Sequence, residues 1–197
     1  MGSGLIIPGE DSTSYSVLLA IPGIDRIFFN NPAAKDRFHT ENIPERALEE
    51  AALFHFGYLS VMKAMYAGEG EELVRYMRKA RIAGATTSLD LAAVDSASEA
   101  GQADRAGNLK RTLPPGDIFV PSAEEICCML DGPCFDRWQG LAWRRDITEE
   151  VVDLIEEAPA LAEQCLRIGA GMVLIKRGSS GMYFHSGVRY SLSRIRS

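Results

Sequence analysis

From Pro44 onward, the sequence alternates between runs typical of buried strands and runs typical of helices. The strand-like runs are FHFG, TTSLDL, DIFVP, GMVLIK, GMYFHS and VRYSLS. Strands that alternate with helices of this length predict βαβ units and a mostly parallel sheet covered by helices on both faces. The expected fold class is therefore α/β, with one main domain over residues 44–197.

A different pattern precedes this alternation. The stretch TSYSVLLAIPGIDRIFFNN holds two β-rich runs, Ser14–Ala20 and Asp25–Asn30, joined by a Pro-Gly turn. Two such runs separated by a turn predict a β-hairpin, which we place within residues 12–32.

Three segments of the main domain carry specific expectations. The run GEGEELVRYMRKARIAG has apolar residues on one face and predicts an amphipathic helix. The segment DGPCFDRWQGLAWRRD is predicted to be irregular, because glycine and proline break any period. After it, Thr148 is expected to cap a helix that Pro159 interrupts and restarts, and that ends at Gly169.

The charge balance argues against two kinds of partner. The chain has 27 acidic and 21 basic residues, and its basic residues are scattered. A nucleic-acid or anionic membrane surface is therefore not expected. No apolar run approaches the roughly 20 residues that a membrane span needs. The four cysteines form no C-x-x-C pair, so free thiols are favoured over a zinc site, and the sequence indicates a cytoplasmic protein.

Polar residues follow three of the predicted strands. Asp90 follows TTSL, Ser122 to Glu125 follow DIFVP, and Lys176 to Gly181 follow GMVLI. If these strands are parallel neighbours, the three groups meet at one edge of the sheet. Carboxylates there suit Mg²⁺, bound directly or through water, and the KRGSSG loop offers backbone N–H groups, hydroxyls and cations to a polyphosphate. Together they describe a nucleotide–metal site.

Each of these features also has a purely structural interpretation. SAEE fits a capping box between Ser122 and Glu125, Asp90 can simply end a strand, and RGSSG can be an ordinary hairpin turn. The glycine-rich IGAGM ends a helix and begins a strand, whereas a phosphate-binding loop should open a helix. We therefore interpret Gly169 as a helix C-cap.

The order of these runs resembles the middle of the PfkB/ribokinase family of sugar and nucleoside kinases. The resemblance rests on FHFGYL, TTSLDL, LPPGDIFVPSAEEICCML and LAEQCLRIGAGMVLIKRGSSGMYF, preceded by the hairpin. It implies a ribokinase-like fold and ATP-dependent phosphorylation of a hydroxyl group on a sugar or nucleoside. The hairpin would be the lid over this substrate, and in relatives such lids often form a dimer contact, which implies a homodimer. The lid residues so implied are Ser14, Ser16, Phe28 and Asn30.

Two family motifs carry over to named positions. A Pro-Asn-x-x-Glu segment that organises Mg²⁺ through water corresponds to Pro121, Ser122 and Glu125, with serine in place of asparagine. A Lys/Thr-x-Gly-x-x-Gly turn lies along the ATP phosphates in the family. The implied nucleotide contacts here are Lys176, Gly178, Ser179 and Gly181.

Two other family signatures are missing from this sequence. One is an amino-terminal Gly-Gly and Asn that contact the sugar. The other is a Gly-Ala-Gly-Asp run whose Asp is the general base, and IGAGM cannot replace it because Met172 stands where Asp is needed. The base would lie beyond Ser197, and the resemblance gives Asp90 no base role. We therefore expect a fragment or truncated product, partial in its fold and weakly active or inactive. The alternative is a non-catalytic ribokinase-like binding or assembly module.

Overall fold

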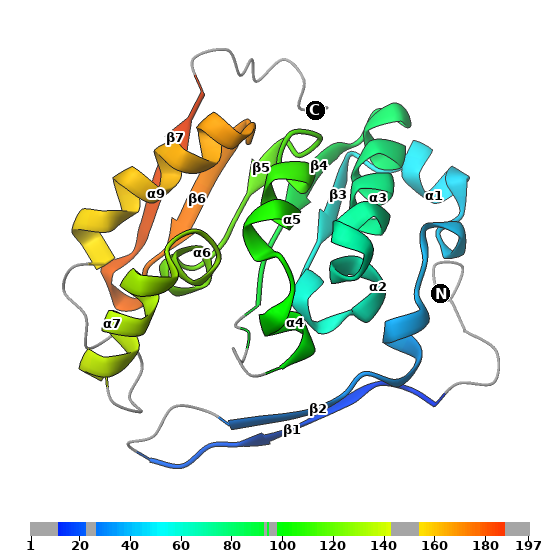
Figure 1. The fold of residues 1–197 in the computed structure, drawn as a ribbon. Coiled ribbons are helices and arrows are strands. Elements are labelled where there is room, and N and C mark those ends of the chain that lie inside the picture. Colours follow the sequence, from blue (N-terminus) through cyan, green and yellow to red (C-terminus); the bar gives the residue numbers. More distant parts are fainter. Residues whose placement is uncertain (1–11, 23–26, 93, 95–97, 143–153, 188–197) are drawn as a thin grey trace.

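The computed structural model describes residues 12–22, 27–92, 94, 98–142 and 154–187 (Figure 1). Its strands are β1 (Tyr15–Leu19), β2 (Ile27–Asn31), β3 (Leu53–Phe56), β4 (Thr86–Leu89), β5 (Ile118–Phe119), β6 (Met172–Lys176) and β7 (Met182–Ser186). Its α-helices are α1 (Glu45–Glu49), α2 (Lys63–Tyr66), α3 (Glu71–Ile82), α4 (Glu99–Gln102), α5 (Arg105–Thr112), α6 (Ala123–Leu130), α7 (Gly132–Ala142) and α9 (Leu154–Ile168). Short 3-10 turns are η1 (Ala33–Arg37), η2 (Thr40–Asn42), η3 (Leu59–Val61), η4 (Gly68–Gly70) and η5 (Gly178–Ser180).

The main sheet has five strands in the order β3-β4-β5-β6-β7. The first four are parallel to one another, and β7 pairs antiparallel with β6. This arrangement confirms the predicted α/β class, with a mostly parallel sheet flanked by helices and a separate hairpin. The carboxyl ends of β3 to β6 consequently lie along one edge, which is the lower edge in Figure 1.

The core lies between this sheet and a layer of helices that includes α3, α5 and α9 (Figure 1). The predicted apolar face of α3 is confirmed, since Leu73, Met77 and Ala80 are fully buried. Alternate strand residues point the other way, and Leu53 and Phe184 are more than half exposed. In Figure 1, α3, α5 and α9 lie on the same side of the sheet. None of the helices in the described ranges is long and apolar enough to span a bilayer.

Helix α7 replaces the irregular segment that the sequence predicted. Pro133 stands in its first turn, where the missing N–H costs little, and the Asp131 carboxylate accepts the N–H of Cys134 at 3.0 Å. Trp138 is fully buried and Phe135 nearly so. The prediction was wrong because tertiary burial of these aromatic side chains outweighs the weak local helical tendency.

Helix α9 runs through Pro159 without the predicted interruption. A proline inside a helix costs about 3 kcal/mol, and the burial of Ala158, Leu161, Ala162 and Cys165 offsets that cost. The predicted C-cap is confirmed: Gly169 has φ +131° and donates its N–H to the Cys165 carbonyl at 3.1 Å. The predicted cap Thr148, like the strand-like run VRYSLS, lies outside the described residues.

The amino-terminal hairpin is formed by β1 and β2, which pair antiparallel and confirm the prediction. It lies beyond the carboxyl ends of the parallel strands (Figure 1). Ser16 faces Asn30 across the pair, and its hydroxyl donates to the Asn30 Oδ1 at 2.5 Å. The beginning of the predicted second run, at Asp25, falls outside the described residues.

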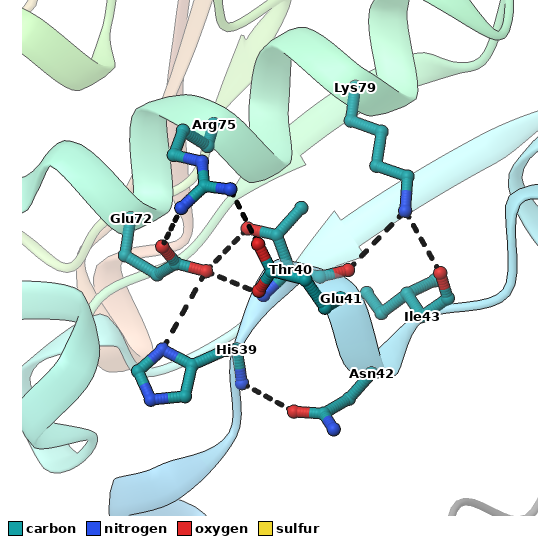
Figure 2. Close-up of polar contacts among 8 residues, drawn as sticks. All are labelled: His39, Thr40, Glu41, Asn42, Ile43, Glu72, Arg75 and Lys79. Carbon is teal, nitrogen blue, oxygen red and sulfur yellow. Dashed lines mark hydrogen bonds and ion pairs between the residues drawn. The ribbon is translucent and has the colours of Figure 1, made fainter.

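A polar network ties the segment after the hairpin to α3 (Figure 2). Glu72 Oε1 accepts hydrogen bonds from the backbone N–H and the hydroxyl of Thr40, both at 2.5 Å. Arg75 bridges Glu72 and Glu41, while Lys79 donates to the Thr40 carbonyl. These contacts fix η2, which follows the hairpin in sequence, on α3.

Candidate functional site

The three polar strand ends meet at the carboxyl edge of the sheet. Asp90 follows β4, Ser122 precedes α6 after β5, and Lys176 ends β6. Lys176 Nζ lies 2.7 Å from Asp90 Oδ1, although 86 positions separate the two residues in sequence. Ser122 forms a parallel bridge with Lys176. The parallel pairing of β4, β5 and β6 therefore brings together groups that the sequence places far apart.

Ser122 and Glu125 form a capping box at the start of α6. The Ser122 hydroxyl accepts the N–H of Glu125 at 3.1 Å, and Glu125 Oε2 accepts the N–H of Ser122 at 2.7 Å. The structural interpretation of SAEE is thus confirmed. Burial raises the pKa of the Glu125 carboxyl, while the N–H of Ser122 and the charge of Lys176 oppose that rise. Glu125 therefore lies within electrostatic reach of the ion pair.

The loop after β6 is a tight turn into β7. The Arg177 N–H donates to the Gly181 carbonyl at 2.9 Å, and the residues between form η5. Gly178 has φ +55° and Gly181 φ +85°, so both occupy a region that favours glycine. The hairpin-turn interpretation of RGSSG is confirmed. Gly178, Ser179 and Gly181, which follow Lys176 in this turn, are exposed.

The implied lid residues lie on the hairpin. Ser16, Phe28 and Asn30 share one face, because Ser16 pairs with Asn30 and Phe28 is two positions from Asn30. Ser14 lies just before β1. The opposite face carries Val17 and Phe29 as a cross-strand pair.

The donor set at the strand ends suits magnesium only through water. Among the described residues, no group of three or more His, Cys, Asp or Glu side chains could hold a metal ion. Glu125 and Asp90 each engage a carboxylate oxygen in the contacts above and have a second oxygen. Mg²⁺ commonly keeps several waters and takes one or two carboxylates, so these two residues fit a hydrated ion.

The sequence did not predict the roles of two residues at the sheet, Tyr58 and Asp117. Tyr58, beyond the end of β3, has φ 64° and ψ 49°, and its N–H donates to the Asp90 carbonyl at 3.2 Å. A left-handed backbone at a tyrosine costs on the order of 1–3 kcal/mol, and no sequence signal marks it. Asp117, at the opposite end of β5, is buried, and its Oδ2 accepts from the N–H and hydroxyl of Thr87. We call this pair of hydrogen bonds the Asp117 clamp. A carboxylate that precedes a strand in the sequence does not by itself predict it.

Comparison with known proteins finds similar structures but no similar sequences. No family model and no curated protein sequence matches the chain. A fructokinase with bound ATP from Xylella fastidiosa matches with TM-score 0.64 and 20% identity, over 93% of this chain and 51% of that one. A ribokinase from Giardia lamblia matches with TM-score 0.60 and 12% identity, over 92% and 46%.

The ribokinase of Arabidopsis thaliana, complexed with ribose and ATP, matches with TM-score 0.54 and 15% identity, over 90% of this chain and 46% of that one. This chain thus spans about half the length of these solved structures. This chain has the ribokinase-like fold of PfkB/ribokinase carbohydrate kinases. The structural matches show this, and the strand order and the hairpin of the chain agree with it.

Proposed function

We propose that this chain provides the nucleotide side of an ATP-dependent kinase that phosphorylates a hydroxyl group of a sugar or nucleoside. The observation that carries the proposal is the convergence of Asp90, Ser122, Glu125 and Lys176 at the carboxyl edge. In open α/β sheets this edge is where ligands bind. The fold is shared with a fructokinase and a ribokinase whose structures contain ATP, which supports ATP as the nucleotide.

Each residue has a role in this proposal. The Lys176 ammonium and the exposed turn of Gly178, Ser179 and Gly181 contact the phosphates with their N–H and hydroxyl groups. Glu125 and Ser122 hold the water shell of Mg²⁺, with Asp90 as a second carboxylate. When bound, Mg²⁺ neutralises charge on the phosphates. Ser14, Ser16, Phe28 and Asn30 contact the acceptor from the hairpin.

The acceptor hydroxyl also needs a base, and this sequence contains no Gly-Ala-Gly-Asp run to provide one. Asp90 is paired with Lys176, and Glu125 is engaged in the capping box. We therefore propose that this chain alone transfers phosphate weakly or not at all. The alternative, a non-catalytic ribokinase-like binding or assembly module, is favoured by the exposed apolar residues of the hairpin.

ATP binding tests the site. In the presence of Mg²⁺, the double variant Glu125→Gln, Lys176→Ala is expected to bind ATP about 10- to 100-fold more weakly, because it loses a charge-assisted contact to phosphate. Calorimetry on the full chain measures the difference. The matched control is Arg46→Ala, Glu50→Gln, which removes an exposed ion pair between α1 and the residue that follows it. Identical affinities for the parent and the Glu125/Lys176 variant would reject this site.

Phosphoryl transfer tests whether this chain supplies its own catalytic base. Transfer of labelled γ-phosphate from ATP is measured with a panel of sugars and nucleosides. We expect transfer at or near background for this chain. Robust transfer that Asp90→Asn or Glu125→Gln abolishes would show that the base lies at the strand ends after all.

The hairpin also supports a homodimer, which we propose to form through its apolar face. Val17 and Phe29 form a cross-strand pair on that face, and both are about half exposed. We expect concentration-dependent self-association that Phe29→Ser weakens, because burial of this face would drive it. Sedimentation velocity measures it, with Ile82→Ser as the control, since Ile82 is an exposed apolar residue on α3. A compact monomer across a wide concentration range would contradict the dimer.

A further inference from the structure

The side chain of Lys176 reaches across the sheet to meet Asp90. β5 lies between β4 and β6, so the Lys176 side chain passes the end of β5 to reach Asp90. The backbone of Lys176 is fixed as well, because its N–H donates to the Pro121 carbonyl at 2.8 Å. Both ends of this long side chain are therefore held by contacts within the chain.

Asp90 is the more rigid member of the pair. Its backbone N–H donates to the Phe56 carbonyl at 2.9 Å, and its Oδ1 also accepts the N–H of Leu91 at 2.8 Å. Its side chain is 17% exposed, against 36% for Lys176. The carboxylate is thus the anchor, and the flexible lysine side chain is the group that it orders.

The ordered ammonium retains hydrogen-bonding capacity. An ammonium group has three N–H donors, and Asp90 is its hydrogen-bond partner among the described residues. The remaining donors are available to an anion at the exposed carboxyl edge. Ordering a lysine before a ligand arrives removes part of the entropic cost of binding.

We propose that Asp90 is a positioning residue, which holds the Lys176 ammonium where it donates to the phosphates of a bound nucleotide. The proposal rests on the nucleotide site proposed above. It predicts the direction in which the loss of the Asp90 charge changes the affinity for the nucleotide. The charge of Asp90 repels phosphate, so its removal should strengthen nucleotide binding if charge were its only contribution. Positioning predicts the opposite whenever Lys176 is present.

The test uses the full chain and four forms: the parent, Asp90→Asn, Lys176→Met and the double variant. ATP and adenosine are titrated by calorimetry in excess EDTA, so that no metal takes part. We expect Asp90→Asn to weaken ATP binding about 3- to 10-fold in the parent. In the Lys176→Met background it should leave ATP binding unchanged or strengthen it. Adenosine, which has no phosphate, should bind equally to all four forms.

The matched control is Asp136→Asn, which makes the same charge change at an exposed position on α7. A second readout needs no nucleotide: NMR relaxation at the Lys176 Cε should show an ordered side chain in the parent and a mobile one in Asp90→Asn. Tighter ATP binding by Asp90→Asn, or equal weakening in both backgrounds, would overturn the positioning role alone. A parent that binds ATP neither in EDTA nor with Mg²⁺ would overturn the nucleotide site and this proposal with it, whereas a parent that binds ATP only with Mg²⁺ would overturn the positioning role alone.

Discussion

Replacing Trp138 with alanine is expected to lower the free energy of unfolding by about 3–5 kcal/mol. Trp138 is fully buried in the core cluster, where it lies with residues of α6 and α9. The truncation would leave a large cavity that the surrounding helices can fill only partly. Chemical denaturation followed by far-UV circular dichroism measures the loss.

Two variants make this result specific. Leu141→Ala changes an apolar residue of the same helix that is 63% exposed, and it should stay within about 0.5 kcal/mol of the parent. Trp138→Phe should cost far less than alanine, because it keeps most of the ring volume. It also removes an indole N–H without a hydrogen-bond partner in the described part of the chain. A loss below about 1 kcal/mol for Trp138→Ala would contradict the packing of α7 described here.

Replacing Asp117 with alanine is expected to destabilise the fold by about 3 kcal/mol. Asp117 Oδ2 accepts from the N–H and from the hydroxyl of Thr87, each at 2.9 Å, and all these groups are buried. Alanine would leave the Thr87 N–H without an acceptor in an apolar environment. The clamp joins the beginnings of β4 and β5, so its loss should loosen the centre of the sheet.

Asp117→Asn is the matched variant for this clamp. It retains a carbonyl oxygen of similar geometry, so we expect a loss of about 1 kcal/mol. Thermal unfolding monitored by circular dichroism compares the two variants with the parent. Equal stability of Asp117→Ala and the parent would show that the hydrogen bonds to Thr87 contribute nothing to the sheet.

Only part of the strand-end site could be predicted from local sequence patterns. The capping box was predictable, because its two residues lie three positions apart and act within one helical turn. The approach of Asp90 and Lys176 was predictable only as a consequence of parallel pairing. Their direct contact at 2.7 Å depends on side-chain conformations that no sequence pattern specifies. The left-handed backbone of Tyr58 was not predictable, since tyrosine has no local preference for that region.

Local sequence by itself determined the class of this protein. Alternating apolar runs, turn residues and helix caps act over a few residues, so they predicted the parallel strands, the hairpin, the apolar face of α3 and the C-cap at Gly169. Tertiary structure alone decided α7, the passage of α9 through Pro159 and the Asp117 clamp. In each of these, burial against distant residues outweighs a local signal or supplies a partner from elsewhere in the chain. Such contacts join residues that are far apart in sequence, so they cannot be predicted from neighbouring residues alone.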